Sequence, residues 1–190
     1  MDKNIPHIVI ISASIRIKRA SHRVALYFKQ YLEEHQLAHV SILDLETWNF
    51  PIFTERLSRM ETPKKDVLDF SARIKAADGV IIVTPEYNGG YPASLKNVVD
   101  LLYDEWYRKP VAISTVSSGP FGGMNVITSI QYTLWKIRAW TIPAQFPVAK
   151  VEESFDAAGV PSDKAGTDKR AQRFIDELLW CVEAKKRMAT

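Results

Sequence analysis

The sequence predicts an α/β fold in which a five-stranded parallel sheet lies between two layers of helices. Short runs of apolar, β-branched residues alternate along the chain with longer stretches whose apolar residues recur at a helical spacing. The runs are apolar throughout rather than alternating, as a sheet covered on both faces requires. Repeated strand–helix alternation indicates parallel strands joined by right-handed crossovers.

The five predicted strands are short and rich in Ile and Val, residues that favour the pleated conformation. HIVIISAS is the first and GVIIVTP is the third, and both are almost wholly apolar. The predicted strands cover residues 7–14, 39–45, 79–85, 110–118 and 141–151.

The predicted helices are recognised by apolar positions three and four residues apart. Ser21 is the predicted N-cap of the first helix. Pro63, after Thr62, marks the start of the second helix, because proline is tolerated in the first turn. The predicted helices cover residues 21–35, 64–77, 94–106, 122–140 and most of 163–187.

Five such strands in one domain, residues 1–190, favour the flavodoxin-like three-layer sandwich with strand order 2-1-3-4-5. Ligands of such sheets lie beyond the carboxyl ends of the strands, at the switch point between the first and third strands. The loops after Ser12, Val83 and Val116 are therefore expected to form the binding site.

Composition excludes several other classes of protein. The net charge of +3 is mild and the basic residues are dispersed, unlike those of a nucleic-acid binder. The one dense run, residues 185–187, is interpreted as a solvated helix end. Cys181 cannot form an internal disulfide and is expected to be a core residue in a reducing compartment. With no signal pattern and no apolar run of about 20 residues, a cytoplasmic protein without membrane contact is expected.

The first of the three loops, SASIRIKRAS, combines hydroxyl and guanidinium groups with a helix N-terminus. Ser14, Arg16, Arg19 and Ser21 offer donors beside the partial positive charge of that terminus. A phosphate monoester is the expected ligand. The alternative is an ordinary solvated turn, and the absence of glycine excludes the common nucleotide-binding fingerprints.

The second and third loops are rich in glycine. In TPEYNGGYPASLKN, Gly89 and Gly90 permit positive φ or close approach to a flat ligand, while Tyr87 and Asn88 can contact a heterocycle. A simple turn would explain Asn-Gly and Pro equally well. In SSGPFGG, residues 117–123, backbone N–H groups suit a carbonyl or a developing anion, although such loops are common.

Together these loops resemble those of the NADPH-dependent FMN reductase family, flavodoxin-like enzymes that include quinone and azo-compound reductases. PEYNGG, followed by Pro92, the tripeptide LKN and Asp100, resembles the family motif P-E-Y-N-x-x-x-P-x-x-L-K-N-x-x-D. The first loop is similar to G-S-x-R-x-x-R, with Ala13 in place of the usual glycine. The third is similar to S-x-G-x-x-G-G. The resemblance extends over residues 5–150.

The resemblance implies FMN as cofactor. Its phosphate would lie in the first loop, its ring along the second, and the pyrimidine end of the ring at the third. Glu86 would have a structural role rather than a catalytic one. The implied cofactor-binding residues are Ser14, Arg16, Arg19, Ser21, Pro85, Glu86, Tyr87, Asn88, Gly89, Ser117, Ser118, Gly119 and Gly122.

The implied activity is a ping-pong oxidoreduction in which NADPH or NADH reduces FMN and a small-molecule acceptor then reoxidises it. Free flavin, quinones, azo compounds and metal oxyanions are candidate acceptors. The flavin carries the chemistry, so no catalytic side chain is expected. No metal site is expected, since the four histidines are scattered without other ligands nearby.

Family members usually form homodimers or homotetramers, so an interface is also expected. Tyr91, Tyr103 and Trp106 are the candidate interface residues, although aromatic residues most often pack in the core.

Two other functions remain open. One is a flavodoxin-type electron carrier, which the pI of about 8.9 disfavours. The other is a redox-sensing protein whose flavin controls binding of a partner.

Overall fold

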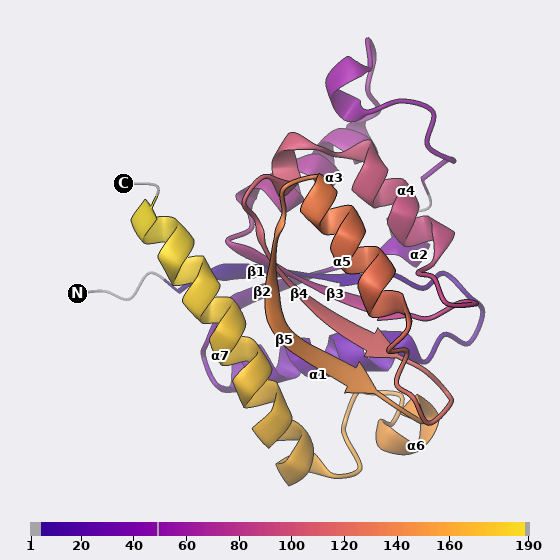
Figure 1. Ribbon diagram of the computed structural model, residues 1–190, viewed down its shortest axis with the longest axis vertical. Helices are drawn as coiled ribbons and strands as arrows, with labels where there is room; N and C mark the ends of the chain where they lie inside the picture. The colour runs from indigo at the N-terminus through magenta and orange to yellow at the C-terminus, as the bar shows by residue number, and fades with distance from the viewer. Residues whose placement is uncertain (1–4, 49, 189–190) are drawn as a thin grey trace.

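The sheet has the predicted architecture. The computed structural model describes residues 5–48 and 50–188; residues 1–4, 49 and 189–190 of the expected domain lie outside the described residues. All four strand pairings are parallel and the order is β2-β1-β3-β4-β5, as predicted (Figure 1). The strands are β1 His7–Ser12, β2 His39–Asp44, β3 Gly79–Pro85, β4 Pro110–Val116 and β5 Trp140–Val148.

Helices and short helical turns connect the strands. The α-helices are α1 Ser21–Glu34, α2 Leu45–Trp48, α3 Lys65–Ala76, α4 Ala93–Leu101, α5 Val126–Lys136, α6 Val151–Ser154 and α7 Lys164–Met188. Two 3₁₀ turns are η1 Leu57–Arg59 and η2 Asp104–Trp106. None of the helices within the described residues is long and apolar enough to cross a bilayer.

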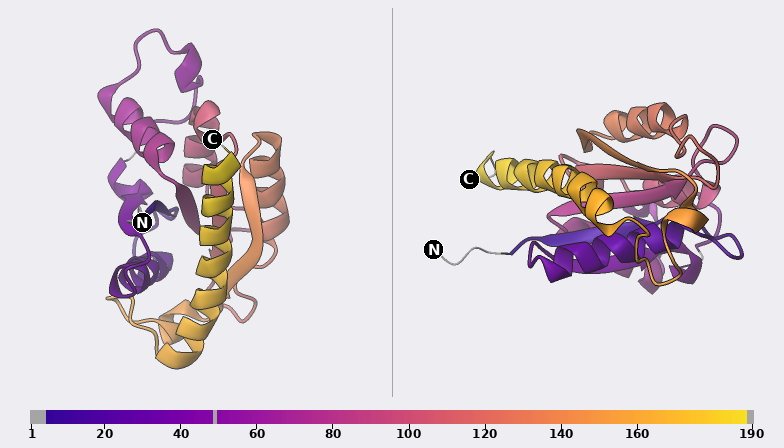
Figure 2. Two further views of the ribbon diagram at one scale, coloured as in Figure 1. Left: turned by 90° about the vertical axis from the view of Figure 1, so that its left-hand side faces the viewer. Right: turned by 90° about the horizontal axis from the view of Figure 1, so that it is seen from below.

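The three central strands, β1, β3 and β4, bury both of their faces, whereas β2 and β5 at the edges are partly exposed, and each face of the sheet has its own hydrophobic core. In β1, Ile8 and Ile10 pack with α1 and α7, whereas Val9 and Ile11 pack with α3, α4 and α5. The two helical layers are visible on either side of the sheet in Figure 2. This double coverage is the reason that the central strands are continuous apolar runs in the sequence.

Several predicted boundaries were wrong. The helix predicted over 94–106 ends at Leu101, and Trp106 lies in the separate turn η2, fully buried with its indole N–H donating to Val99 O at 3.2 Å. Trp106 therefore serves the core and cannot be an interface residue. The helix predicted over 122–140 covers only Val126–Lys136, because the chain turns at Arg138 to enter β5.

The predicted N-cap of α1 was also wrong. Ala20 occupies the N-cap position with helical dihedral angles, and Ser21 is the first residue inside the helix. No side-chain hydrogen bond caps this end of α1 within the described residues. The first N–H groups of α1 therefore have no side-chain acceptor, which matters for the site described below.

Lys109 is a buried cation at the amino end of β4. Its side chain is almost fully enclosed, and its ammonium donates to the carbonyl oxygens of Lys75, at 3.1 Å, and Ala77. Burial lowers its pKa from 10.5 to about 8, with further lowering by the charge of Lys185 and partial compensation by Asp78. Carbonyl oxygens thus replace water for this group without neutralising its charge.

This burial makes the free energy of unfolding vary with pH in the alkaline range. Between the folded pKa of about 8 and the ordinary value of 10.5, the unfolded chain binds more protons than the folded one, so stability rises with pH. Relative to Lys109→Met, the unfolding free energy of the natural protein should increase by about 3 kcal/mol across this range. Urea denaturation at several pH values measures it. The difference in unfolding free energy between the natural protein and the exposed variant Lys75→Met should not change with pH, because that variant retains Lys109. An equal pH dependence in the natural protein and in Lys109→Met would contradict the assignment.

Candidate active site

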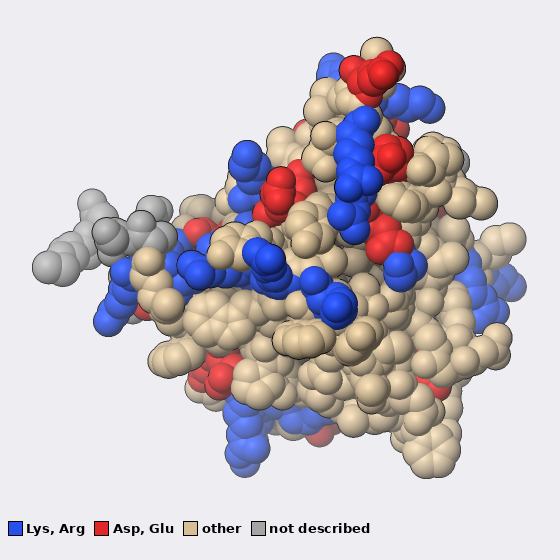
Figure 3. Space-filling view, turned by 45° about the horizontal axis from the view of Figure 1, so that its top comes forward, with Lys and Arg blue, Asp and Glu red and all other residues tan. Residues whose placement is uncertain are grey.

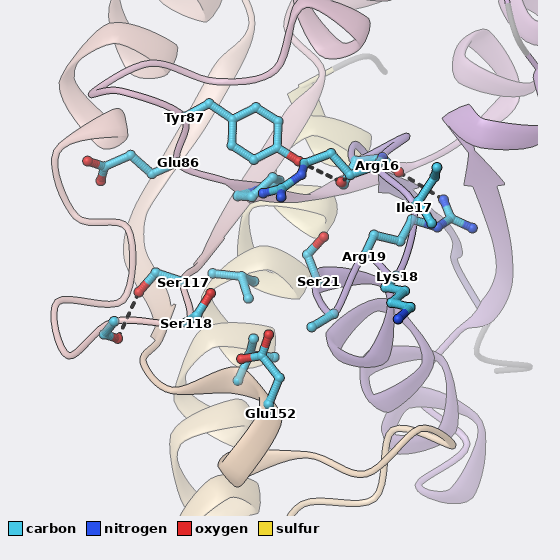
Figure 4. Close-up of a pocket in the computed structure, with 16 residues that line it drawn as sticks. Arg16, Ile17, Lys18, Arg19, Ser21, Glu86, Tyr87, Ser117, Ser118 and Glu152 are labelled. Carbon is cyan, nitrogen blue, oxygen red and sulfur yellow. Dashed lines mark hydrogen bonds between the residues drawn. The ribbon is translucent and has the colours of Figure 1, made fainter.

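The three predicted loops converge on one cavity at the carboxyl edge of the sheet. The cavity has a volume of about 470 Å³ and lies between the ends of β1, β3 and β4, with α6 closing its lower side in Figure 4. Its lining consists of Ser14, Arg16, Ile17, Lys18, Arg19, Ala20, Ser21, Pro85, Glu86, Tyr87, Val116, Ser117, Ser118, Gly119, Val151 and Glu152. The switch-point argument therefore located the cavity correctly.

Unused donors gather where α1 begins. The hydroxyl oxygen of Ser21 is buried and has no hydrogen-bond partner among the described residues, and its side chain is directed into the cavity (Figure 4). It lies beside the uncapped N–H groups of α1. Arg16 is exposed on the preceding loop and forms no ion pair with any described carboxylate. A buried hydroxyl without a hydrogen-bond partner normally lowers the stability of a protein, and a ligand with an acceptor atom at this place would remove that penalty.

Ser14 and Tyr87 link the first loop to the second. The Ser14 hydroxyl and the Tyr87 hydroxyl are 2.8 Å apart, and Ser14 is almost fully buried. The guanidinium of Arg16 lies over the Tyr87 ring at 5.5 Å from its centroid. These contacts hold Tyr87 and Arg16 at one wall of the cavity, although their sequence positions are far apart.

Arg19 is held by carboxylates rather than free. Its guanidinium makes a bidentate ion pair with Asp44, contacts Glu46 at 2.8 Å and donates to Ser14 O at 2.9 Å. The hydrogen bond to Asp44 raises the pKa of Arg19. Burial raises the pKa of Asp44, but hydrogen bonds from Arg19 and from the Glu46 N–H outweigh it and hold that pKa below its usual value. Arg19 thus fastens the first loop to the end of β2.

Gly89 of the second loop lies in a tight turn that requires a positive φ. Tyr87 and Gly90 exchange backbone hydrogen bonds of 2.8 and 3.1 Å, and both central residues have positive φ, 53° for Asn88 and 80° for Gly89. This is the geometry of a type I′ turn, for which Asn-Gly is the preferred pair. Neither central residue lines the cavity. The turn interpretation therefore accounts for Asn88 and Gly89.

Glu86 joins the second loop to the third. Its carboxylate accepts hydrogen bonds from the backbone N–H and the side-chain amide of Asn125, each at 3.0 Å. Gly122 also lies outside the lining, and a Cβ there would approach Pro147 Cβ to 3.0 Å. Its positive φ and this close packing explain why the third loop needs glycine.

The third loop is fastened to the end of β5. The Ser117 N–H donates to Val148 O at 2.9 Å, and the Ser117 hydroxyl donates to Gly119 O at 2.9 Å. Val151 and Glu152, which follow β5, complete the lining and were not predicted. The rule that carboxyl ends of parallel strands share an edge would have identified them, had it been applied to the fifth strand as well.

Comparison with known proteins gives the family. The sequence profile of the NADPH-dependent FMN reductase family matches residues 6–153. The chain belongs to this family. It is 35% identical to an NAD(P)H-dependent FMN reductase from Nectria sp over 199 aligned positions, which cover 94% of this chain and 98% of that protein. It is 26% identical to a quinone reductase from Pseudomonas putida, covering 94% and 96% of the two chains.

A solved structure agrees with the fold. FerB, an NAD(P)H:acceptor oxidoreductase from Paracoccus denitrificans, superposes with a TM-score of 0.77 at 22% identity, covering 95% of this chain and 98% of that one. The family member described here is therefore a flavodoxin-like FMN-dependent NAD(P)H oxidoreductase, as its loop motifs predicted. The unpartnered Ser21 hydroxyl, the uncapped start of α1 and the exposed Arg16 fit the phosphate of FMN.

Proposed function

We propose that the protein passes two electrons from NADPH or NADH, by way of FMN in the cavity between the three loops, to a quinone or a similar small-molecule acceptor. The observation that carries the proposal is the buried, unpartnered Ser21 hydroxyl beside the uncapped start of α1. Both features lack an acceptor in the protein itself, and a phosphate monoester supplies several. The quinone reductase from Pseudomonas putida supports the acceptor class.

The first loop would hold the phosphate through two kinds of contact. Ser21 and the first N–H groups of α1 would donate hydrogen bonds, and Arg16 would add a charge-assisted contact. Arg19 would act indirectly, since Asp44 and Glu46 already neutralise its charge. Ser14 would fix the position of Tyr87 through their shared hydrogen bond.

The second and third loops would hold the flavin ring. Pro85, Glu86 and Tyr87 provide one wall of the cavity, and the segment Ser117–Gly119 provides another. FMN, when bound, supplies the hydride-accepting ring, while the protein orients it and supplies donors toward developing negative charge. The Glu86 carboxylate is occupied by Asn125, so we assign it no proton-transfer role.

NAD(P)H and the acceptor would enter the same cavity in turn, which is ping-pong kinetics. Anaerobic mixing of the FMN-loaded protein with NADPH or NADH should bleach the flavin absorbance within the time of a turnover. Addition of benzoquinone should then restore it. Slow bleaching with both nicotinamides would instead indicate an electron carrier.

Because the reaction consumes NAD(P)H, we also propose that the protein acts in the cytoplasm.

Two substitutions test the phosphate site. Arg16→Ala should raise the Kd for FMN by roughly tenfold or more, the contribution of one charge-assisted hydrogen bond. Ser21→Ala should also weaken FMN binding, yet leave the FMN-free protein as stable or more stable, because it removes a buried orphan hydroxyl. Flavin fluorescence titration and thermal unfolding measure the two effects. Arg59→Ala, exposed on η1, is the matched control. Unchanged FMN affinity in Arg16→Ala and Ser21→Ala would refute this assignment.

We propose a homodimer formed through α5 and the third loop. Phe121, Met124, Tyr132 and Trp135 are large apolar residues with exposed fractions of 78%, 45%, 62% and 65%. Tyr132 and Trp135 lie three residues apart on α5, and Phe121 and Met124 precede the helix in the segment that continues from the loop lining the cavity. The predicted interface residue Tyr91 adjoins it through a 2.8 Å hydrogen bond to Thr133, whereas Tyr103 contacts Arg56.

A pair of tryptophan variants tests this interface. Trp135→Glu places a charge in the proposed interface and should convert the dimer to a monomer at micromolar concentration. Trp180, on α7, is equally exposed at 65%, so Trp180→Glu should leave the mass unchanged. Light scattering during size-exclusion chromatography measures the mass. A monomeric natural protein, or a dimer that survives Trp135→Glu, would disprove the proposed interface.

A further inference from the structure

A second cavity lies at the opposite edge of the sheet from the candidate active site, at the amino ends of β4 and β5. It has a volume of about 520 Å³, within the range of small-molecule sites. We call it the basic cavity. It lies where the chain enters β4, where it enters β5, and where α7 ends. Its lining is Tyr107, Arg108, Arg138, Ala139, Trp140, Lys185 and Met188.

The two arginines of the basic cavity occupy backbone positions that favour glycine. Arg108 has φ of 52° in a tight turn in which the Lys109 N–H donates to Trp106 O at 3.0 Å. Arg138 has φ of 62° at the end of α5. There the N–H groups of Arg138 and Ala139 donate to Trp135 O and Leu134 O, the pattern of a Schellman motif, whose left-handed residue is usually glycine.

These two turns are joined to each other. The Arg108 N–H donates to Arg138 O at 2.8 Å, so the two left-handed residues lie side by side. Both guanidinium groups lie near one ring, at 5.0 and 5.9 Å from the centroid of Tyr107. Two glycine-favouring positions thus carry arginine at the same place in the molecule, and their side chains converge on an aromatic wall.

The positive charge of the basic cavity is not neutralised by neighbouring carboxylates. Neither Arg108, Arg138 nor Lys185 forms an ion pair within residues 5–48 and 50–188. The nearby carboxylate of Asp78 pairs instead with Lys186, at 3.1 Å. Figure 3, which brings the top of Figure 1 forward, shows Lys and Arg side chains in a band across this end of the molecule. Of the basic run predicted to be a solvated helix end, Lys185 lines the basic cavity and Arg187 is exposed.

We propose that the basic cavity binds a small aromatic anion, such as an aryl carboxylate, at a site separate from the candidate active site. The aromatic part would pack on Tyr107, Trp140 and Met188. The acidic group would contact the guanidinium groups of Arg108 and Arg138, whose planar donors match a carboxylate. Apolar walls with a few convergent cations are the usual composition of a site for such a ligand.

The glycine-favouring backbone allows a clean test. Arg108→Gly and Arg138→Gly remove a guanidinium but retain the backbone conformation, so the unfolding midpoint should not fall. Calorimetry with the FMN-loaded protein and 2-naphthoate should give one-to-one binding. Either variant should weaken it by roughly tenfold or more. The neutral 2-naphthamide should bind as weakly to the natural protein as 2-naphthoate binds to the variants.

Two controls separate charge and backbone effects. Gln36→Gly changes another residue with positive φ, and Arg173→Gln removes an exposed cation from α7; both should bind 2-naphthoate normally. If a glycine variant does not fold, Arg138→Asn, which also tolerates positive φ, replaces it. Absence of binding, release of FMN by 2-naphthoate, or equal affinity in the arginine variants would each overturn the proposal.

Discussion

The parallel pairing of β1 with β2 on one side and β3 on the other is the constraint on which the active site depends. The register places Ser12 beside Asp44 and beside Val83, so β1 and β2 end at the same level and β3 continues two residues further, to Pro85. The loop that leaves β1 must therefore emerge between the other two ends. The Ala13 N–H continues the ladder to Val83 O at 3.0 Å, and the Ser94 hydroxyl caps the Ala13 carbonyl at 2.7 Å. Both bonds fix where the first loop starts.

Within that loop, the two arginines have different tasks because of what the register places near each. Arg19 reaches back to Asp44 at the end of β2, and the pair is largely shielded from water, with side-chain exposures of 11% and 15%. A shielded bidentate pair holds its geometry better than a surface pair. Arg16 projects to the other side of the loop, where no described carboxylate meets it. The order imposed by one arginine leaves the other available to a ligand.

The sequence predicted the features that depend on local pattern, and missed those that depend on tertiary contacts. Apolar runs and the carboxyl-edge rule were sufficient for the strand order and for the cavity. Ser21 was expected to cap its own helix, but α1 begins one residue earlier than that prediction requires, with Ala20 at the N-cap position and Ser21 inside the first turn. Trp106 left its predicted helix because the core beneath α4 accepts an indole ring there. The spacing of apolar residues in the sequence indicates neither the N-cap of α1 nor the end of α4.

The same reasoning explains why the basic cavity is invisible in the sequence. Propensity predicts glycine for a left-handed residue, so arginine at positions 108 and 138 gives no signal of a turn end or of a site. Only the structure shows that both residues are left-handed and bonded to one another. The two cavities then follow one physical logic at opposite ends of β4. At each, polar groups of the free protein lack a partner among the described residues, the Ser21 hydroxyl in one and the charges of Arg108 and Arg138 in the other, and a ligand of negative charge supplies one.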